Sequence, residues 1–243
     1  MQLANKCALI TGGSQGLGRA IAQRLAGAGM DIALHYKGSP EQAQQTAQQV
    51  RQLSPKSLAV QADLCQPQQI QIMLDKLRIE LGPIDALVNN AAIFVPTPLE
   101  EFDPAVWKQI FEVNVFGPAA LSQSLGKQMK LRGAGKIINI LDVAAQRPFA
   151  SHAGYCASKA ALASLTKSWA KALAPQVQVN AVAPGIIDWP DFFSDAQRRT
   201  YLQQTPLGRL AAYDDVAGTV LFLLKEAPFI TGQIINVDGG RTL

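Results

Sequence analysis

Short apolar runs alternate with longer amphipathic segments along the whole chain. The apolar runs do not alternate with polar residues, which is typical of parallel strands buried on both faces. Seven such strands are expected, at Cys7–Thr11, Asp31–Tyr36, Ser57–Gln61, Ala86–Asn89, Lys136–Leu141, Val177–Val182 and Gln233–Val237. The segments between them predict helices at Gln15–Gly29, Pro40–Leu53, Pro67–Leu81, Pro104–Leu131, Tyr155–Ala174 and Tyr213–Lys225.

This alternation predicts an α/β fold with a Rossmann-type, doubly wound parallel sheet of seven strands, which binds its ligands at the carboxyl ends of the strands. The longest irregular stretch, 184–208, follows the end of a strand, where a loop that covers a substrate would lie. We therefore expect one domain over 1–243, with a substrate lid near 184–208.

A glycine-rich turn follows the first strand, in the segment TGGSQGLGRAIA. Gly12, Gly16 and Gly18 fall where the chain passes from strand to helix. Glycine lets the backbone bend sharply there and approach a pyrophosphate, whose charge is favourable at a helix N-terminus. The position of the turn predicts a dinucleotide site, although a purely structural turn would have the same glycines.

The end of the second strand indicates which dinucleotide binds. Tyr36 is followed by Lys37, Gly38 and Ser39, and no acidic residue occurs before Glu41. An NAD site usually places an acid here to hold the ribose 2′-hydroxyl, whereas a lysine and a serine suit a 2′-phosphate. We expect NADPH rather than NADH; the alternative is that the lysine is only a solvated loop charge.

Composition excludes several classes of protein. Among 243 residues, 22 are basic and 18 acidic, giving a net charge of +4 with the basic residues scattered, unlike a nucleic-acid binder. The excess suits an anionic small ligand or has no functional meaning. No apolar run is long enough for a membrane span, and the N-terminal segment is expected to be a strand rather than a signal peptide. Three cysteines without CxxC spacing predict a reducing, cytoplasmic location and no metal site.

A tyrosine and a lysine are candidates for catalysis. Tyr155 and Lys159 stand one helical turn apart in YCASK. A nearby ammonium favours the ionised form of a phenol, so Tyr155 could exchange a proton beside a site of hydride transfer. By itself, a pair at this spacing is commonplace and far more often belongs to a helix surface than to a catalytic site.

Five motifs occur in an order that resembles the short-chain dehydrogenase/reductase family. They are TGGSQGLG, NNAA at 89–92, Asn114 within VNV, YCASK, and Pro184–Gly185, and the resemblance extends through TGQIINVDGG at 231–240. The resemblance implies proton-relay roles for Tyr155, Lys159 and Asn114, the last holding a relay water through the neighbouring backbone. It also implies pairing through the helices at 104–131 and 155–174, often as a homo-tetramer.

One position departs from the family pattern. Asp142 stands 13 residues before the tyrosine, where the family has a catalytic serine. A serine polarises a substrate carbonyl, whereas an ionised aspartate repels a developing oxyanion and is better suited to a ring nitrogen. With LHYKGS at 34–39 and Phe94 placed to stack on a flat ring, Asp142 resembles the pteridine reductase branch, which includes dihydromonapterin reductases. Gly16 and Ala92 differ from that branch's usual arginine and serine.

The resemblance implies an NADPH-dependent reductase of heterocyclic C=N bonds, as in dihydropterins or dihydrofolate. A carbonyl reductase of the 3-oxoacyl thioester type is the first alternative, and an NADPH-binding sensor or scaffold without turnover is the second. In the lid, Trp189 and its aromatic neighbours either close over a flat substrate or pack on the body. His35 is expected to be structural, and His152 to lie in an exposed loop rather than beside the substrate.

The candidate site residues fall into three groups. The catalytic residues are Asp142, Tyr155, Lys159 and Asn114. Those expected to bind the coenzyme are Gly12, Ser14, Gly16, Leu17, Gly18, Tyr36, Lys37, Ser39, Asp63, Leu64, Asn90, Ala91, Tyr155, Lys159, Pro184, Gly185 and Ile187. Those expected to bind the substrate are Phe94, Asp142, Tyr155, Ile186 and Trp189.

Overall fold

Seven parallel strands form one sheet, in the order β3-β2-β1-β4-β5-β6-β7, in the computed structural model, which describes residues 1–243. The order reverses between β1 and β4, and a crevice at such a switch point is where doubly wound sheets bind ligands. The strands are β1 (Cys7–Ile10), β2 (Asp31–Tyr36), β3 (Leu58–Gln61), β4 (Ala86–Asn89), β5 (Gly135–Ile140), β6 (Val177–Pro184) and β7 (Ile234–Val237).

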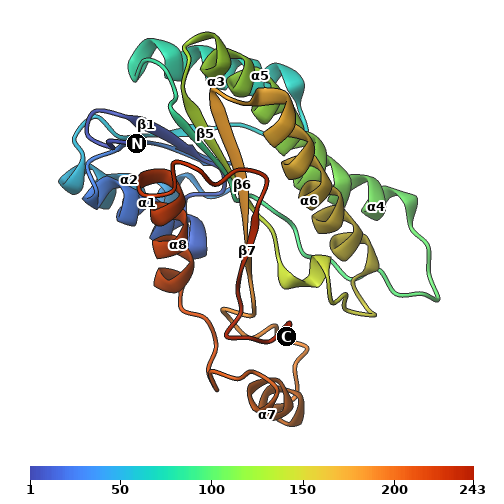
Figure 1. The fold of residues 1–243 in the computed structure, drawn as a ribbon. Coiled ribbons are helices and arrows are strands. Elements are labelled where there is room, and N and C mark those ends of the chain that lie inside the picture. The colour runs from blue at the N-terminus through green and yellow to red at the C-terminus, as the bar shows by residue number, and fades with distance from the viewer.

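Helices cover both faces of the sheet (Figure 1). Helices α1, α2 and α8 lie on one face, and α3, α5 and α6 lie on the other. The elements are α1 (Gly16–Gly27), α2 (Pro40–Leu53), α3 (Pro67–Glu80), α4 (Pro104–Phe111), the π-helix η1 (Glu112–Phe116), α5 (Gly117–Leu131), the 3₁₀-helix η2 (Val143–Ala145), α6 (Ala153–Leu173), α7 (Asp195–Gln203) and α8 (Tyr213–Lys225).

The apolar strands bury residues in two separate cores. Ala8 and Ile10 of β1 pack towards α1 and α8, whereas Cys7 and Leu9 pack towards α3 and α5. All four residues are buried. Because both faces of the strand are covered, no polar residue is needed at alternate positions, which explains the uninterrupted apolar runs.

The predicted sheet and five of the six predicted helices are confirmed, with ends that differ by up to two residues. Two predictions need correction. The helix expected over 104–131 is interrupted by the π-helical turn η1, and the stretch 184–208, expected to be irregular, contains α7. The Ser194 hydroxyl accepts from the Gln197 N–H in a capping box that starts α7. This helix buries only Tyr201, so it has no apolar stripe to reveal it in the sequence.

The segment 184–208 leaves the carboxyl end of β6 and carries α7 to the same end of the molecule as the C-terminal residues (Figure 1). The carboxyl ends of β4 and β5 lead into the segments that carry Phe94 and Asp142. No helix has the combination of length and apolar character that crossing a membrane requires.

Candidate active site

The turn after β1 has a geometry that requires glycine. Gly12 and Gly16 have φ values of +63° and +51°, in the left-handed region. A Cβ on Gly18 would stand 2.2 Å from the Gly12 carbonyl oxygen. The Asn90 amide donates hydrogen bonds of 2.9 and 3.1 Å to the carbonyls of Thr11 and Gly12, which fixes the turn against the end of β4.

His35 supports the same turn from β2. The Gly12 N–H donates to His35 Nδ1 over 3.2 Å, and His35 Nε2 donates to the Ala62 carbonyl over 3.0 Å. This pairing needs the neutral imidazole, and burial lowers the pKa of His35, which favours that form. The expectation that His35 is structural agrees with these contacts.

Lys37 lies at the end of β2 and forms an ion pair with Asp63 after β3, with Nζ 2.8 Å from the carboxylate. The hydrogen bond with Asp63 raises the pKa of Lys37. The Lys37 side chain remains more than half exposed. The pair, which the sequence did not indicate, holds a cation where the 2′-substituent of a bound dinucleotide is expected.

Asp142 makes two hydrogen bonds at the carboxyl end of β5. Its Oδ2 accepts from the Tyr155 hydroxyl over 2.8 Å, and its Oδ1 accepts from the Ala144 N–H over 2.7 Å. Asp142 is therefore both the N-cap of η2 and the partner of the candidate catalytic tyrosine. Burial raises the pKa of Asp142. The hydrogen bonds from Ala144 and Tyr155 lower it, but by less than burial raises it.

Lys159 is buried one turn along α6 from Tyr155. Its Nζ donates to the Ile140 carbonyl over 2.8 Å and lies 5.7 Å from the centre of the Tyr155 ring. Burial lowers the pKa of Lys159 to about 8. Burial and the Asp142 carboxylate raise the pKa of Tyr155 well above its ordinary value. The effects of burial and of the carboxylate thus outweigh the effect that we expected from the ammonium. Tyr155 is therefore a neutral phenol able to donate a proton.

Asn114 joins the segment after β4 to α6. Its side-chain amide donates to the Ile93 carbonyl and to the Ser158 hydroxyl, each over 3.0 Å, and its Oδ1 accepts from the Ile93 N–H. Asn114 lies in η1, and π-helical turns occur frequently at functional sites. The result is that Phe94, which follows Ile93, is held in a fixed position relative to Tyr155.

A cluster of aromatic rings packs next to Tyr155. The Phe94 ring stacks on His152 with centres 4.0 Å apart and meets the Tyr155 ring edge-on at 4.6 Å. Phe192 of the segment 184–208 stacks on the same His152 ring at 5.0 Å. The expectation that His152 lies in an exposed loop is wrong: its side chain is buried because Phe94 covers it.

The start of the segment 184–208 lies beside the glycine turn. The Tyr213 hydroxyl donates to Asp188, and a Cβ on Gly16 would lie 3.5 Å from that hydroxyl oxygen. Ile186 is held by a hydrogen bond from its N–H to the Tyr201 hydroxyl. Trp189 packs against Tyr201, within the segment 184–208 rather than against Phe94.

The fold and motifs define the class of protein. A family model described as short chain dehydrogenase matches residues 6–200. The chain belongs to the short-chain dehydrogenase/reductase family. It is 37% identical over 239 residues to the 3-oxoacyl-(acyl-carrier-protein) reductase FabG of Staphylococcus aureus, covering 97% of each chain.

Two other relatives show how broad the similarity is. The chain is 32% identical to 3beta-hydroxysteroid dehydrogenase 1 of Eggerthella lenta, covering 99% of this chain and 95% of that protein. A gluconate 5-dehydrogenase from Burkholderia cenocepacia, solved in complex with NADP and tartrate, superposes with a TM-score of 0.93 at 32% identity, covering 99% and 96%. None of these is named a pteridine reductase, so the family prediction is confirmed and the pteridine branch is not.

Proposed function

We propose that this protein is an NADPH-dependent reductase in which Tyr155 donates the proton. The observation that carries the proposal is the buried Tyr155 hydroxyl, kept neutral beside the Lys159 ammonium at the ligand-binding end of the sheet. When bound, NADPH supplies the hydride. The ammonium stabilises the phenolate that remains once Tyr155 has given up its proton.

The residues present fit a bound dinucleotide phosphate. The glycine turn at 12–18 bends tightly into the N-terminus of α1, where a pyrophosphate would bind, and a Cβ on Gly18 would clash with the Gly12 carbonyl within that turn. Lys37 would hold the 2′-phosphate, and Lys159 would reach the nicotinamide ribose. The NADP complex of the superposed gluconate 5-dehydrogenase supports this choice of coenzyme.

The relatives favour a carbonyl substrate of the 3-oxoacyl thioester type, which was the first alternative drawn from the sequence. Asp142 is compatible with this reaction when its carboxyl group is protonated. A neutral carboxyl donates a hydrogen bond to a developing oxyanion, as a serine hydroxyl does. The raised pKa of Asp142 favours that form.

A dihydropterin-like substrate is the second candidate, and the carboxyl group of Asp142 is the observation that favours it. A carboxyl group pairs well with a ring nitrogen, and the Phe94 ring, which stacks on His152, lies edge-on to Tyr155. His152 already covers one face of Phe94, so a flat ligand would stack on the other face or displace the imidazole.

The experiment is a panel assay of NADPH absorbance with acetoacetyl-CoA, dihydrobiopterin and dihydrofolate. Faster oxidation with the thioester supports carbonyl reduction, and faster oxidation with either pterin supports the second candidate. Binding of NADPH without oxidation by any of the three would reject the reductase proposal in favour of a sensor or scaffold.

We also propose that the segment 184–208 acts as the substrate lid.

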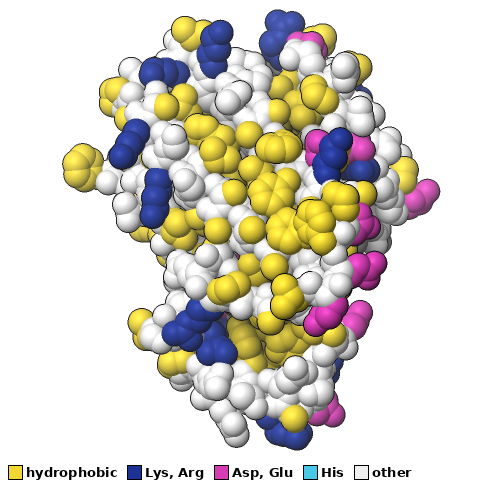
Figure 2. All heavy atoms as spheres, turned by 90° about the vertical axis from the view of Figure 1, so that its right-hand side faces the viewer, with side chains coloured by type: hydrophobic (Ala, Val, Ile, Leu, Met, Phe, Trp, Pro, Cys, Tyr) yellow, Lys and Arg dark blue, Asp and Glu magenta, His cyan; other side chains and the backbone are white.

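We propose further that two copies of the chain pair through α5 and α6. Apolar side chains gather on the helical face shown in Figure 2. Among the residues of α6 and of the turn before α5, Phe116 is 55% exposed, and Ala153, Ala157 and Ala160 are exposed. Sedimentation tests the pairing: a monomer at micromolar concentration would reject it.

A further inference from the structure

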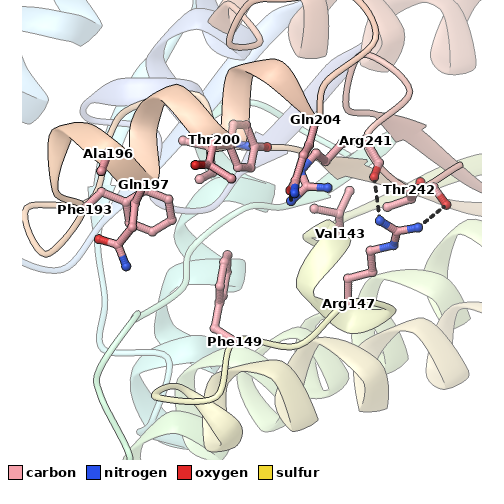
Figure 3. A pocket seen from close by; sticks show the side chains of 12 residues that line it. Val143, Arg147, Phe149, Phe193, Ala196, Gln197, Thr200, Gln204, Arg241 and Thr242 are labelled. Carbon is pink, nitrogen blue, oxygen red and sulfur yellow. Dashed lines mark hydrogen bonds between the residues drawn. The ribbon is translucent and has the colours of Figure 1, made fainter.

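A cavity of about 340 Å³ lies next to the catalytic residues, between the η2 loop, α7 and the C-terminal segment (Figure 3). Val143, which directly follows Asp142, and Phe149, which packs against Tyr155 and its neighbours, form the wall on the catalytic side. The opposite wall comes from α7 and the residues before it. Its apolar lining is completed by Ile186, Phe193 and Ala196.

Two arginines stand on one side of this cavity in Figure 3. The Arg147 guanidinium donates to the Arg241 carbonyl and to a terminal carboxyl oxygen of Leu243, each over 2.9 Å. The Arg241 guanidinium donates to Gln204 Oε1 over 2.7 Å and lies 5.1 Å from the centre of the Tyr201 ring. Both partners of Arg241 are uncharged, so they orient its charge without neutralising it.

No acidic group compensates the Arg241 guanidinium, whereas Arg147 lies on the terminal carboxyl group of Leu243. Neither Arg147 nor Arg241 forms an ion pair with an acidic side chain. The carboxylate of Asp238 accepts instead from the backbone N–H groups of Gly240 and Thr242 and from the Thr242 hydroxyl. In addition, Arg241 Nε is buried and has no hydrogen-bond partner. A guanidinium group with an uncompensated charge and a free donor is suited to a carboxylate, phosphate or sulfonate.

We propose that this cavity is a subsite for an anionic group carried on an apolar ligand, with Arg241 as its main recognition residue and Arg147 beside it. The apolar walls cover the body of the ligand, and Arg241 binds its charged end. As a substrate subsite the cavity rests on the proposed reductase function. It selects, within either substrate class, molecules that carry a negative charge away from the reacting bond.

The direct test measures binding rather than turnover. The probe is 1-anilinonaphthalene-8-sulfonate, an apolar ring system with one anionic group, compared with the uncharged N-phenyl-1-naphthylamine. Both are titrated by fluorescence with NADP⁺ present in excess to fill the coenzyme cleft. We expect Arg241→Gln to weaken sulfonate binding about 10- to 100-fold, as for one charge-assisted hydrogen-bonded contact, and to leave the uncharged probe within twofold.

Further variants test whether the probes bind in this cavity. Ala196→Trp fills the cavity from the opposite wall and is expected to weaken both probes. Arg241→Lys keeps the charge and is expected to bind the sulfonate more tightly than Arg241→Gln. Arg78→Gln, at an exposed position on α3, makes the same charge change elsewhere and serves as the matched control. Sulfonate affinity within twofold of wild type in both Arg241→Gln and Ala196→Trp would overturn the proposal.

A kinetic comparison then tests whether substrates use the cavity. With Arg241→Gln, we expect the KM for acetoacetyl-CoA to rise about tenfold or more, while the KM for ethyl acetoacetate stays unchanged. If the substrate is a pterin, the same comparison is made between dihydrofolate, which carries a negative charge, and dihydrobiopterin, which does not. Equal changes for the charged and uncharged members would reject the substrate role. If no substrate is turned over, the reductase proposal fails, and the probe titration still decides whether the cavity binds anions.

Discussion

Replacing Asp142 with serine separates the two roles of its carboxyl group. One oxygen caps η2 by accepting from the Ala144 N–H, and the other accepts from the Tyr155 hydroxyl. A serine has a single, nearer oxygen and cannot make both contacts. If the serine oxygen turns towards Tyr155, the Ala144 N–H loses its cap, which costs about 0.5–2 kcal/mol. For a domain of this size, about 2–4 °C per kcal/mol then gives a melting temperature lower by about 1–8 °C.

The chemical effect of Asp142→Ser depends on the substrate. A serine hydroxyl donates to a carbonyl oxygen at any pH, so we expect acetoacetyl-CoA turnover to be kept or raised. A ring nitrogen loses its carboxyl partner, so dihydrobiopterin turnover is expected to fall about 10- to 100-fold, the equivalent of one charge-assisted hydrogen bond. Turnover is followed by NADPH absorbance, and the melting temperature is measured on the same preparations.

Asp142→Asn is the matched control because it retains an acceptor for the Ala144 N–H but cannot ionise. Its melting temperature is expected to lie closer to that of wild type than the melting temperature of Asp142→Ser does. If both variants turn over both substrates at the wild-type rate while Asp142→Ser melts lower, Asp142 is only a cap. The contact between Asp142 and Tyr155 would then take no part in the chemistry.

The coenzyme and proton sites lead to three more predictions. Lys37→Asp should weaken the binding of NADPH at least tenfold but not that of NADH, because it replaces the partner of the 2′-phosphate with a carboxylate. An NADPH affinity equal to that of wild type in a fluorescence titration would contradict this. Because the pKa of Lys159 is about 8, turnover should be steady below that pH and fall above it, as the lysine loses the charge that stabilises the phenolate of Tyr155; a rise above pH 8 would contradict it. Gly18→Ala should abolish coenzyme binding, since its Cβ would stand 2.2 Å from the Gly12 carbonyl oxygen; wild-type affinity in the same titration would disprove this.

The fold was predictable because burial on both faces leaves a direct trace in the sequence. Leu9 and Ile10 point to different cores, and both positions therefore have to be apolar. Helix α7 leaves no such trace, because only Tyr201 is buried and its other residues are mostly polar or small. The π-helical turn at 112–116 was also missed, since one added residue in a helical turn changes the apolar spacing too little to be recognised.

The site was predictable where it depends on local spacing and not where it depends on tertiary contacts. Tyr155 and Lys159 are one turn apart on one helix, so their proximity follows from the sequence. The burial of His152 results from Phe94, which belongs to the segment after another strand. Arg147 reaches a carbonyl 94 positions further along the chain, and no local pattern indicates that contact.

Tyr155 is the proposed proton donor of an NADPH-dependent reduction, and Tyr155→Phe tests this role directly. The variant keeps the ring and its contacts with Phe94 while the hydroxyl is lost. Turnover of the substrate found in the panel assay is expected to fall by about 10²–10⁴-fold, the usual contribution of general acid catalysis. The NADPH dissociation constant should stay within twofold of wild type. Turnover near the wild-type rate in folded Tyr155→Phe would mean that another group donates the proton.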